Sequence, residues 1–307
     1  MLHGHFRNLE FTGGVHFGRH LLEDADISFQ ADTLFSALCQ EAVKEQCLEK
    51  FLAMARAGEL LISDAFPYMG SQYFLPKPFL WIKPGEERGD STEKKKLKKM
   101  QYLPAEYLDA YCQGAFPIDK MEDLSDLGNF QMKVSVSIRG QEEPKPYRVQ
   151  YYCFKEGNGL YFLLGAKEKE GKALFDELMA SLSYSGLGGK RSSGLGRFEC
   201  RAFPVPDALL RGLARKGSRY MLLSCALPRD EELDQAVEGA DYQLVKRSGF
   251  VASADYAPQQ MRKRDLYVFH SGSCFRQPFQ GDIWDVSAGG NHPVYRYGKG
   301  LFMGVTV

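Results

Sequence analysis

A glycine-rich, basic segment at residues 185–197 limits the possible folds of this chain more than any other feature. Its thirteen residues, SGLGGKRSSGLGR, include five glycines and three basic side chains. A helical pattern at residues 170–182 precedes the segment, and an alternating strand pattern at 197–203 follows it. Because glycine adopts positive φ angles and lets a backbone approach other groups closely, the sequence predicts a shaped loop that connects a helix to a strand.

The residue types in this loop favour binding of phosphate groups. Successive backbone N–H groups can form an anion-binding nest, and basic and hydroxyl side chains bind phosphate oxygens. The loop is not a nucleotide-binding P-loop, because that motif follows a strand and opens a helix, the reverse of the order here. A flexible connection is the alternative. The predicted RNA-binding residues of the loop are Gly186, Gly188, Gly189, Lys190, Arg191, Ser192, Ser193, Gly194, Gly196 and Arg197.

The elements expected around this loop follow the order β-α-β-β-α-β, which is typical of a ferredoxin-like fold in the α+β class. Asp32 is placed to N-cap the first helix. The clearest strand is 131–139, in which Met132, Val134, Val136 and Ile138 alternate with polar residues. Strands are expected at 2–11, 131–139, 147–154, 160–164 and 197–203, with a turn at 157–159 after the third, and helices at 33–47 and 170–182.

Two further features divide the chain. Pro204-Val205-Pro206 predicts a boundary between domains 1–205 and 206–307, the second more irregular. Its expected strands are 219–227, 242–251, 266–271 and 301–307, with an acidic helix at 230–238. Within the first domain, the charged segment at about 83–117 is flanked by Pro and Gly and carries a lysine run at Lys94–Lys99. We expect it to be an insertion that projects from the domain.

Composition excludes several classes of protein. The formal net charge is zero, which argues against a protein that coats nucleic acid without specificity but allows a local basic surface. The seven cysteines form no CxxC, so neither a disulfide framework nor a structural zinc site is expected, and a reducing cytoplasm fits best. No signal core, membrane span or metal-binding histidine spacing occurs in the sequence. No cofactor, metal or catalytic residue is predicted.

Other candidate residues leave alternatives open. His16, in GGVHFG at 13–18, suits a general base, an RNA contact or a core residue, and Phe17 suits stacking on a nucleobase. Arg139 and Arg262-Lys263-Arg264 suit either RNA contact or carboxylate pairing. Arg296, between two tyrosines, suits RNA stacking or simple packing.

These pieces together resemble a known family, the fourth subunit of the Csm complex, which is the type III-A CRISPR effector. The glycine-rich signature of RAMP proteins corresponds to 188–197, and the resemblance runs nearly end to end. The segments that carry it are 13–18, 31–38, 62–68, 74–78, 188–197, 247–251 and 292–298. Together with the loop residues, the candidates for RNA contact are His16, Phe17, Gly18, Arg139, Arg247 and Arg296.

The resemblance implies two ferredoxin-like, RRM-type domains and a noncatalytic subunit that binds the crRNA 5′ handle. It implies docking on the large Palm-domain subunit (Csm one type) and on the first backbone RAMP subunit (Csm three type). The insertion at about 83–117 would be a projecting thumb that displaces a base. Two alternatives remain: a metal-independent endoribonuclease using His16 or His20, and a scaffold whose loop contacts protein.

Overall fold

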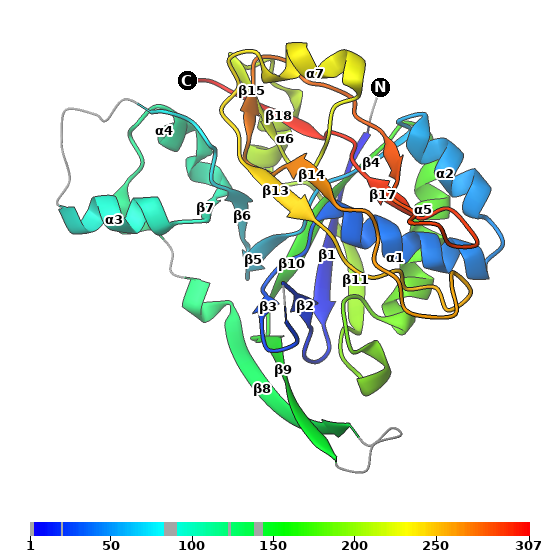
Figure 1. The fold of residues 1–307 in the computed structure, drawn as a ribbon. Coiled ribbons are helices and arrows are strands. Elements are labelled where there is room, and N and C mark those ends of the chain that lie inside the picture. Colours follow the sequence, from blue (N-terminus) through cyan, green and yellow to red (C-terminus); the bar gives the residue numbers. More distant parts are fainter. Residues whose placement is uncertain (1–2, 20, 83–90, 122–123, 138–143) are drawn as a thin grey trace.

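A seven-stranded antiparallel sheet forms the centre of the molecule (Figure 1). The computed structural model describes residues 3–19, 21–82, 91–121, 124–137 and 144–307. The strand order is β11-β1-β10-β5-β6-β7, and β4 pairs with β10 beside β5. The strands are β1 (His3–Phe11), β4 (Leu60–Ile62), β5 (Phe66–Met69), β6 (Gln72–Pro76), β7 (Tyr102–Pro104), β10 (Asn158–Ala166) and β11 (Phe198–Phe203).

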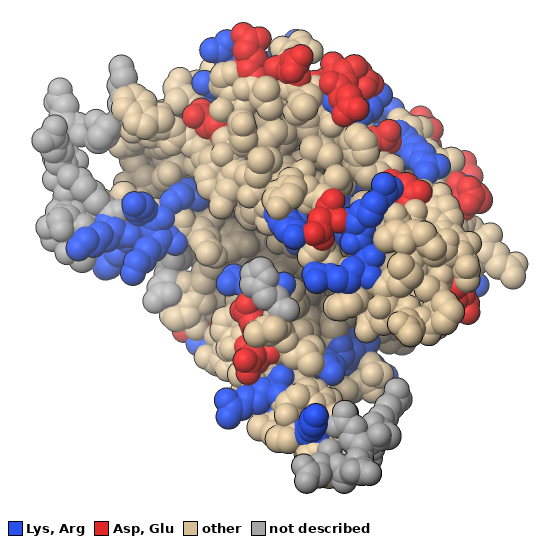
Figure 2. Space-filling view, in the orientation of Figure 1, with Lys and Arg blue, Asp and Glu red and all other residues tan. Residues whose placement is uncertain are grey.

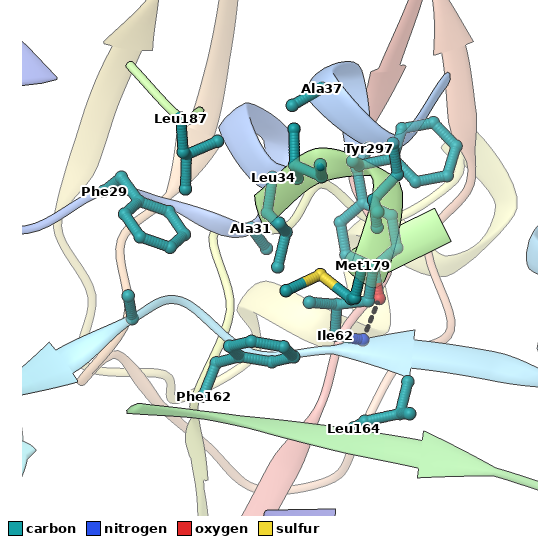
Figure 3. Close-up of a cluster of buried hydrophobic side chains, with 14 of the residues drawn as sticks. Phe29, Ala31, Leu34, Ala37, Ile62, Phe162, Leu164, Met179, Leu187 and Tyr297 are labelled. Atoms are coloured by element: carbon teal, nitrogen blue, oxygen red, sulfur yellow. Dashed lines mark hydrogen bonds between the residues drawn. The ribbon is translucent and has the colours of Figure 1, made fainter. Parts of the chain in front are cut away.

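Three helices cover one face of this sheet: α1 (Ala31–Lys44), α2 (Leu48–Arg56) and α5 (Lys169–Ser185). Strand alternation sends Phe162 and Leu164 of β10 toward the helices, where they meet Leu34 and Met179 (Figure 3). The Ile62 backbone N–H donates to the Tyr297 hydroxyl at 2.8 Å, so a C-terminal residue closes this core. The predicted helices at 33–47 and 170–182 are confirmed.

The C-terminal residues cover the opposite face of the sheet. Helix α6 (Asp207–Ala214) packs beside a small sheet of β15 (Cys274–Phe275), β12 (Arg219–Leu222) and β18 (Phe302–Val305). Phe6 of β1 shares a buried cluster with Met221 and Val305. One core therefore spans the expected boundary at Pro204-Val205-Pro206, and the division into two domains stays a prediction.

The remaining C-terminal elements are short. They are α7 (Asp230–Val237) and the strand pairs β13 (Leu244–Arg247) with β14 (Leu266–Phe269) and β16 (Ile283–Asp285) with β17 (Tyr295–Tyr297). The α+β class is confirmed, as are the acidic helix and a strand within each of the four expected ranges. The central sheet matches the order β-α-β-β-α-β through β1, α1, β5, β10, α5 and β11, with the unexpected strand β5 in the place predicted for 131–139. Two ferredoxin-like domains stay a prediction. No described helix has both the length and the apolar character needed to span a membrane.

Strands β8 (Gly128–Ser137) and β9 (Lys145–Phe154) form a two-stranded sheet of their own that extends away from the body (Figure 1). We call this hairpin the arm. The expected strand 131–139 is confirmed as far as Ser137, but Met132, Val134 and Val136 are 47%, 63% and 53% exposed. The turn before Asn158 is present, yet it joins β9 to a strand of a different sheet.

The expected insertion at 83–117 projects only in part. Helix α3 (Ser91–Lys99) stands away from the body (Figure 1). Strand β7, however, extends the central sheet beside β6, and Leu108 and Cys112 of α4 (Leu108–Cys112) are buried. The prediction of a projecting segment is therefore wrong for its second half. Short 3₁₀ helices lie at η1 (Ala105–Tyr107), η2 (Ile118–Lys120), η3 (Leu124–Asp126) and η4 (Arg191–Ser193).

Candidate nucleic-acid interface

The glycine-rich loop has a defined conformation set by its glycines. Gly186, Gly188, Gly194 and Gly196 have φ angles of 79°, 95°, 85° and 83°, in the region that favours glycine. The Leu187 backbone N–H donates to the Gly196 carbonyl at 2.8 Å and closes the loop on itself. A Cβ atom at Gly196 would overlap the Leu187 carbonyl oxygen. The loop is thus a compact structure within the described chain and not only a flexible connection.

The loop docks on the GGVHFG segment, a contact that the sequence did not predict. The Gly189 N–H donates to the His16 carbonyl at 2.8 Å, and the Gly196 N–H donates to the Gly14 carbonyl at 2.9 Å. Gly18 lies in β2 (Phe17–Gly18), which pairs with β3 (Ala25–Asp26). The two motifs therefore form one surface.

Two predicted RNA contacts of this segment have side chains that are buried. His16 is 4% exposed, and its Nδ1–H donates to the Gln150 carbonyl at 2.6 Å. Phe17 is 5% exposed and packs its ring 5.0 Å from that of Phe29. The Phe17 ring packs into the core, and stacking of Phe17 on a nucleobase stays a prediction. The imidazole of His16 supports the loop, the structural alternative that the sequence left open.

A cavity of about 630 Å³ opens on one side of the loop, and we call it the cationic cavity. Its walls come from the loop, the β2–β3 segment, the N-terminal turn of α1 and strand β13. Basic side chains gather around the hollow at the centre of Figure 2. The charged side chains that line it are Arg19, Asp26, Asp32, Arg191, Lys246, Arg247, Lys263 and Arg296.

Asp32 lies in the floor of this cavity and does not cap its helix. The N-cap is Gln30, and the first helical N–H, that of Ala31, donates to Asp64 at 2.8 Å. The Asp32 carboxylate instead accepts from Arg247 at 2.9 Å and 2.7 Å, and from Arg296. The predicted N-cap role of Asp32 is wrong. We call Asp32, Arg247 and Arg296 the Asp32 centre.

Electrostatics fix the protonation of the Asp32 centre. Burial raises the pKa of Asp32, but the charge and hydrogen bonds of Arg247, followed by those of Arg296, outweigh burial and hold that pKa well below its usual range. The carboxylate therefore stays ionised at neutral pH and holds both guanidinium groups in place. Arg296 also donates to the Ser248 carbonyl at 3.2 Å, while its buried Nε lacks a partner among the described residues.

The other predicted contacts are distributed over two sides of the loop. Arg191 donates to the Gln40 side-chain oxygen at 3.1 Å and lines the cationic cavity. Lys190 points to the opposite side, with Nζ 4.7 Å from the centre of the Tyr147 ring. Ser192, Ser193 and Arg197 are exposed on the loop surface. Arg139 lies outside the described residues.

Sequence reasoning missed several side chains of this interface. Lys263 was visible only as the centre of a basic triplet. In the structure Arg262 stacks on Phe250, Arg264 donates to the Asp285 carbonyl, and Lys263 alone of the three lines the cavity. Desolvation by burial lowers the pKa of Lys263. Nothing in the sequence distinguished Tyr147 or Tyr151, whose positions depend on the arm.

Comparison with known proteins shows sequence similarity to one protein family. Residues 215–305 match the family model of the CRISPR Csm4 C-terminal domain. The chain is 40% identical over 297 residues to the CRISPR system Cms protein Csm4 of Mycobacterium tuberculosis, and the match covers 94% of each chain. The protein of the same name from Streptococcus thermophilus is 36% identical over 302 residues, which cover 95% of this chain and 96% of that protein.

Solved structures share the fold. A crystal structure of a Csm3–Csm4 subcomplex of the type III-A CRISPR-Cas interference complex matches with a TM-score of 0.65 and 16% identity, covering 97% of this chain and 98% of that one. A Csm1–Csm4 cassette with AMPPNP matches with a TM-score of 0.61 and 21% identity, covering 99% and 98%. Fold and sequence matches together define a RAMP-type subunit of a type III-A CRISPR effector complex. Within that class, the chain belongs to the Csm4 family.

Proposed function

We propose that this chain binds the 5′ handle of crRNA in the cationic cavity and contributes no chemistry of its own. The observation that carries the proposal is the lining of the cavity, which contains six Lys or Arg side chains and two Asp side chains. Phosphate oxygens are the usual partners of such a surface. The chain as a whole is neutral, so this excess of cations is local.

Each part of the cavity has a separate role in this proposal. The glycine-rich loop brings Arg191 to the wall of the cavity, and the exposed hydroxyls of Ser192 and Ser193 lie on the loop surface outside the cavity lining. The positive end of the α1 dipole faces the same space. Asp32 neutralises part of the charge of Arg247 and Arg296, so these two arginines mainly shape the floor of the cavity. Arg191 and Lys263 line the cavity and pair with no carboxylate among the described residues, so their positive charge is available to phosphate groups.

We infer partners from the relatives. The structures named as Csm3–Csm4 and Csm1–Csm4 complexes support docking of this chain on a backbone RAMP subunit and on the large Palm-domain subunit.

The arm fits the role of a projecting thumb better than residues 83–117, because β7 and α4 belong to the body. We also propose that domains 1–205 and 206–307 are two ferredoxin-like units and that the protein works in the cytoplasm.

A noncatalytic role is supported by the setting of His16. Its ring is buried, and one nitrogen is already engaged by the Gln150 carbonyl, so it is poorly placed to take a proton from a ribose hydroxyl. Incubation of repeat RNA with excess protein in EDTA tests this role, and specific cleavage lost in His16→Ala would contradict it.

The binding role is tested by the double substitution Lys190→Ala/Arg191→Ala. Loss of two cations, Arg191 in the cationic cavity and Lys190 on the opposite side of the loop, should weaken binding of handle-bearing RNA about tenfold or more and reduce the salt slope by about 2. Fluorescence anisotropy at several salt concentrations measures both effects. Lys50→Ala is the matched control, because Lys50 pairs with Glu170 on the helical side. Equal affinity of the wild-type chain for RNA with and without the handle would argue against handle recognition.

A further inference from the structure

A lysine-rich helix, α3, stands apart from the cationic cavity and has no part in the proposed function. Its described side chains include Lys95, Lys96, Lys98 and Lys99, all of which are exposed. Figure 2 shows a dense basic cluster over α3, separate from the basic side chains around the central hollow. We call these four lysines the α3 cluster.

The α3 cluster places like charges beside one another on one short helix. Lys99 follows Lys95 by four residues and Lys96 by three, and side chains at these spacings are neighbours on a helix surface. Among the residues that the structure describes, no carboxylate forms an ion pair with any of the four lysines. Like charges at this spacing destabilise a helix. An external polyanion would remove this repulsion, so the cluster has the character of a binding surface.

The C-terminal end of α3 is fixed to the central sheet. Lys77, directly after β6, donates from Nζ to the Leu97 carbonyl at 2.9 Å and to the Lys98 carbonyl at 3.3 Å. The Lys77 backbone N–H donates to the Gln101 carbonyl at 2.8 Å, and β7 then pairs with β6. These bonds satisfy carbonyls that have no partner within the helix. The α3 cluster is therefore carried by an anchored helix.

A cavity of about 510 Å³ lies at the base of α3, and we call it the α3 cavity. Lys96 and Lys99 belong to its lining as well as to the α3 cluster. None of the described residues that line it is acidic. Its volume lies within the range for small-molecule sites, so it can accept one nucleotide. The remaining lining residues are mostly apolar: Met100, Gln101, Tyr102, Ile118, Met121 and Leu124.

This combination of groups favours a strand of nucleic acid. Successive phosphates present the repeated negative charge that a group of lysines binds. A base presents a flat apolar face to Tyr102 and polar edge atoms to Gln101. Because Lys96 and Lys99 are shared by the cluster and the cavity, the anionic and the flat apolar groups of the ligand must be close together, as phosphate and base are within one nucleotide.

We propose that the α3 cluster and the α3 cavity form a second nucleic-acid site, which binds a single strand that lacks the handle. The lysines bind successive phosphates, and the cavity accepts one base. The site goes beyond the proposed function, because it requires no handle and shares no lining residue with the cationic cavity. RNA and DNA both have the required chemistry, and the test distinguishes them. An acidic peptide of a partner subunit is the competing occupant.

The test uses the full chain premixed with one equivalent of unlabelled handle RNA, which occupies the cationic cavity. A labelled uridine oligomer of about 15 nucleotides is the probe, long enough to cover a single-strand site. Lys95→Gln/Lys96→Gln/Lys98→Gln/Lys99→Gln removes the α3 cluster. This variant should weaken binding of the oligomer about tenfold or more and reduce the salt slope by about 3. Its affinity for labelled handle RNA alone should stay within about twofold of wild type.

A matched variant controls for net charge. Lys50→Gln/Lys167→Gln/Lys169→Gln/Lys216→Gln removes the same number of exposed lysines from other parts of the chain and should bind the oligomer as wild type does. Glutamine and lysine have similar helix propensities, so α3 should remain helical in the cluster variant. Circular dichroism and thermal melts of each variant verify the fold.

A reciprocal variant separates the two sites. Arg191→Ala/Lys263→Ala alters the cationic cavity and should weaken binding of handle RNA while leaving the oligomer within about twofold of wild type. If the cluster variant loses both ligands in equal proportion, there is no separate site and the inference is overturned. If wild-type protein binds the oligomer but not the handle RNA, the proposed function fails and the α3 site stands. If it binds neither, both fail.

Three further probes identify the ligand. A deoxythymidine oligomer of the same length distinguishes DNA from RNA, and tighter binding of either one supports the site and names its strand. An abasic oligomer should bind about tenfold more weakly, because one stacked base is lost from the α3 cavity; equal binding would overturn the role of the cavity. If a glutamate-rich peptide displaces the oligomer at equal concentration, the competing occupant is favoured and the nucleic-acid site is overturned.

Discussion

The Asp32 centre and the arm place residues in opposite environments. In the Asp32 centre three charged side chains are withdrawn from solvent, and each is held by partners from distant segments of the chain. In the arm, apolar side chains of β8 are exposed, and the two strands pair with one another along their length, with one bridge from Tyr152 to Val15 in the body. Buried charges persist only with fixed partners, whereas exposed apolar surface usually marks contact with another molecule. The first region therefore maintains the shape of the cationic cavity, whereas the second presents an apolar outer face that is available for contact with another molecule.

Asp32→Asn should have the largest effect, because it leaves two guanidinium groups buried around a neutral amide. We expect a loss of about 3–5 kcal/mol in the free energy of unfolding, as for other buried ion pairs that lose one partner. Urea denaturation measures it. Asp126→Asn, which removes an exposed pair with Lys155 near the base of the arm, should leave the midpoint unchanged. Similar free energies of unfolding for the two variants would show that the buried ion pairs of Asp32 stabilise the fold no more than an exposed pair near the arm does.

The same substitution has a defined pH dependence. The pKa of Asp32 is lowered in the folded state, so its contribution is complete above the unfolded value of about 3.9 and is lost as pH falls through the lower folded value. The difference in stability between wild type and Asp32→Asn should therefore be constant from pH 8 to about pH 5 and shrink only in stronger acid. Thermal melts across this range test it. A difference that already shrinks near pH 6 would mean that another group controls the centre.

The glycine-rich loop lies between the two regions, and two of its glycines allow a matched comparison. Gly194 and Gly196 have nearly equal positive φ angles, but space surrounds Gly194, whereas a Cβ at Gly196 would overlap the Leu187 carbonyl. Gly194→Ala should cost about 1 kcal/mol of unfolding free energy from backbone strain, and Gly196→Ala about 2 kcal/mol or more. RNA affinity should fall only for Gly196→Ala. Equal effects would show that the loop is not closed in solution.

Val134→Ser should have the smallest effect, because the side chain is exposed on the outer face of the arm. A change within about 0.5 kcal/mol is expected for a surface substitution. Chemical denaturation of the isolated chain measures it. A clearly larger loss would show that the outer face packs against the body of the same chain, and the arm would then resemble the Asp32 centre in being a buried structural element.

Much of the central fold was predictable because its signals are local. The helices α1 and α5, the strands β1 and β11 and the glycine-rich loop between α5 and β11 all follow from periodicity and turn chemistry. The short strands β4, β5 and β6 were not expected as elements, because runs of three to five residues carry little periodicity. The Csm4 family resemblance is confirmed, since it depends on several ordered segments and not on one motif.

The errors came from partners distant in the sequence. An aspartate beside the start of a helix normally indicates an N-cap, but Asp64 binds the first helical N–H and leaves Asp32 to pair with arginines more than 200 residues away. The alternation of apolar and polar residues in β8 correctly predicted a strand, but it does not indicate whether the apolar face is buried or exposed. The same limit applies to Tyr147 and Tyr151, because nothing in the sequence indicates that they lie beside the glycine-rich loop.

The cluster that joins Phe6 in the first strand to Val305 in the last also affects synthesis of the protein. During translation the sheet face that carries Phe6 emerges from the ribosome nearly 300 residues before the strand that covers it. A nascent chain must keep this apolar face exposed until β18 appears, and prematurely terminated chains would expose it permanently. Exposed apolar surface of this kind makes an incomplete chain prone to aggregation.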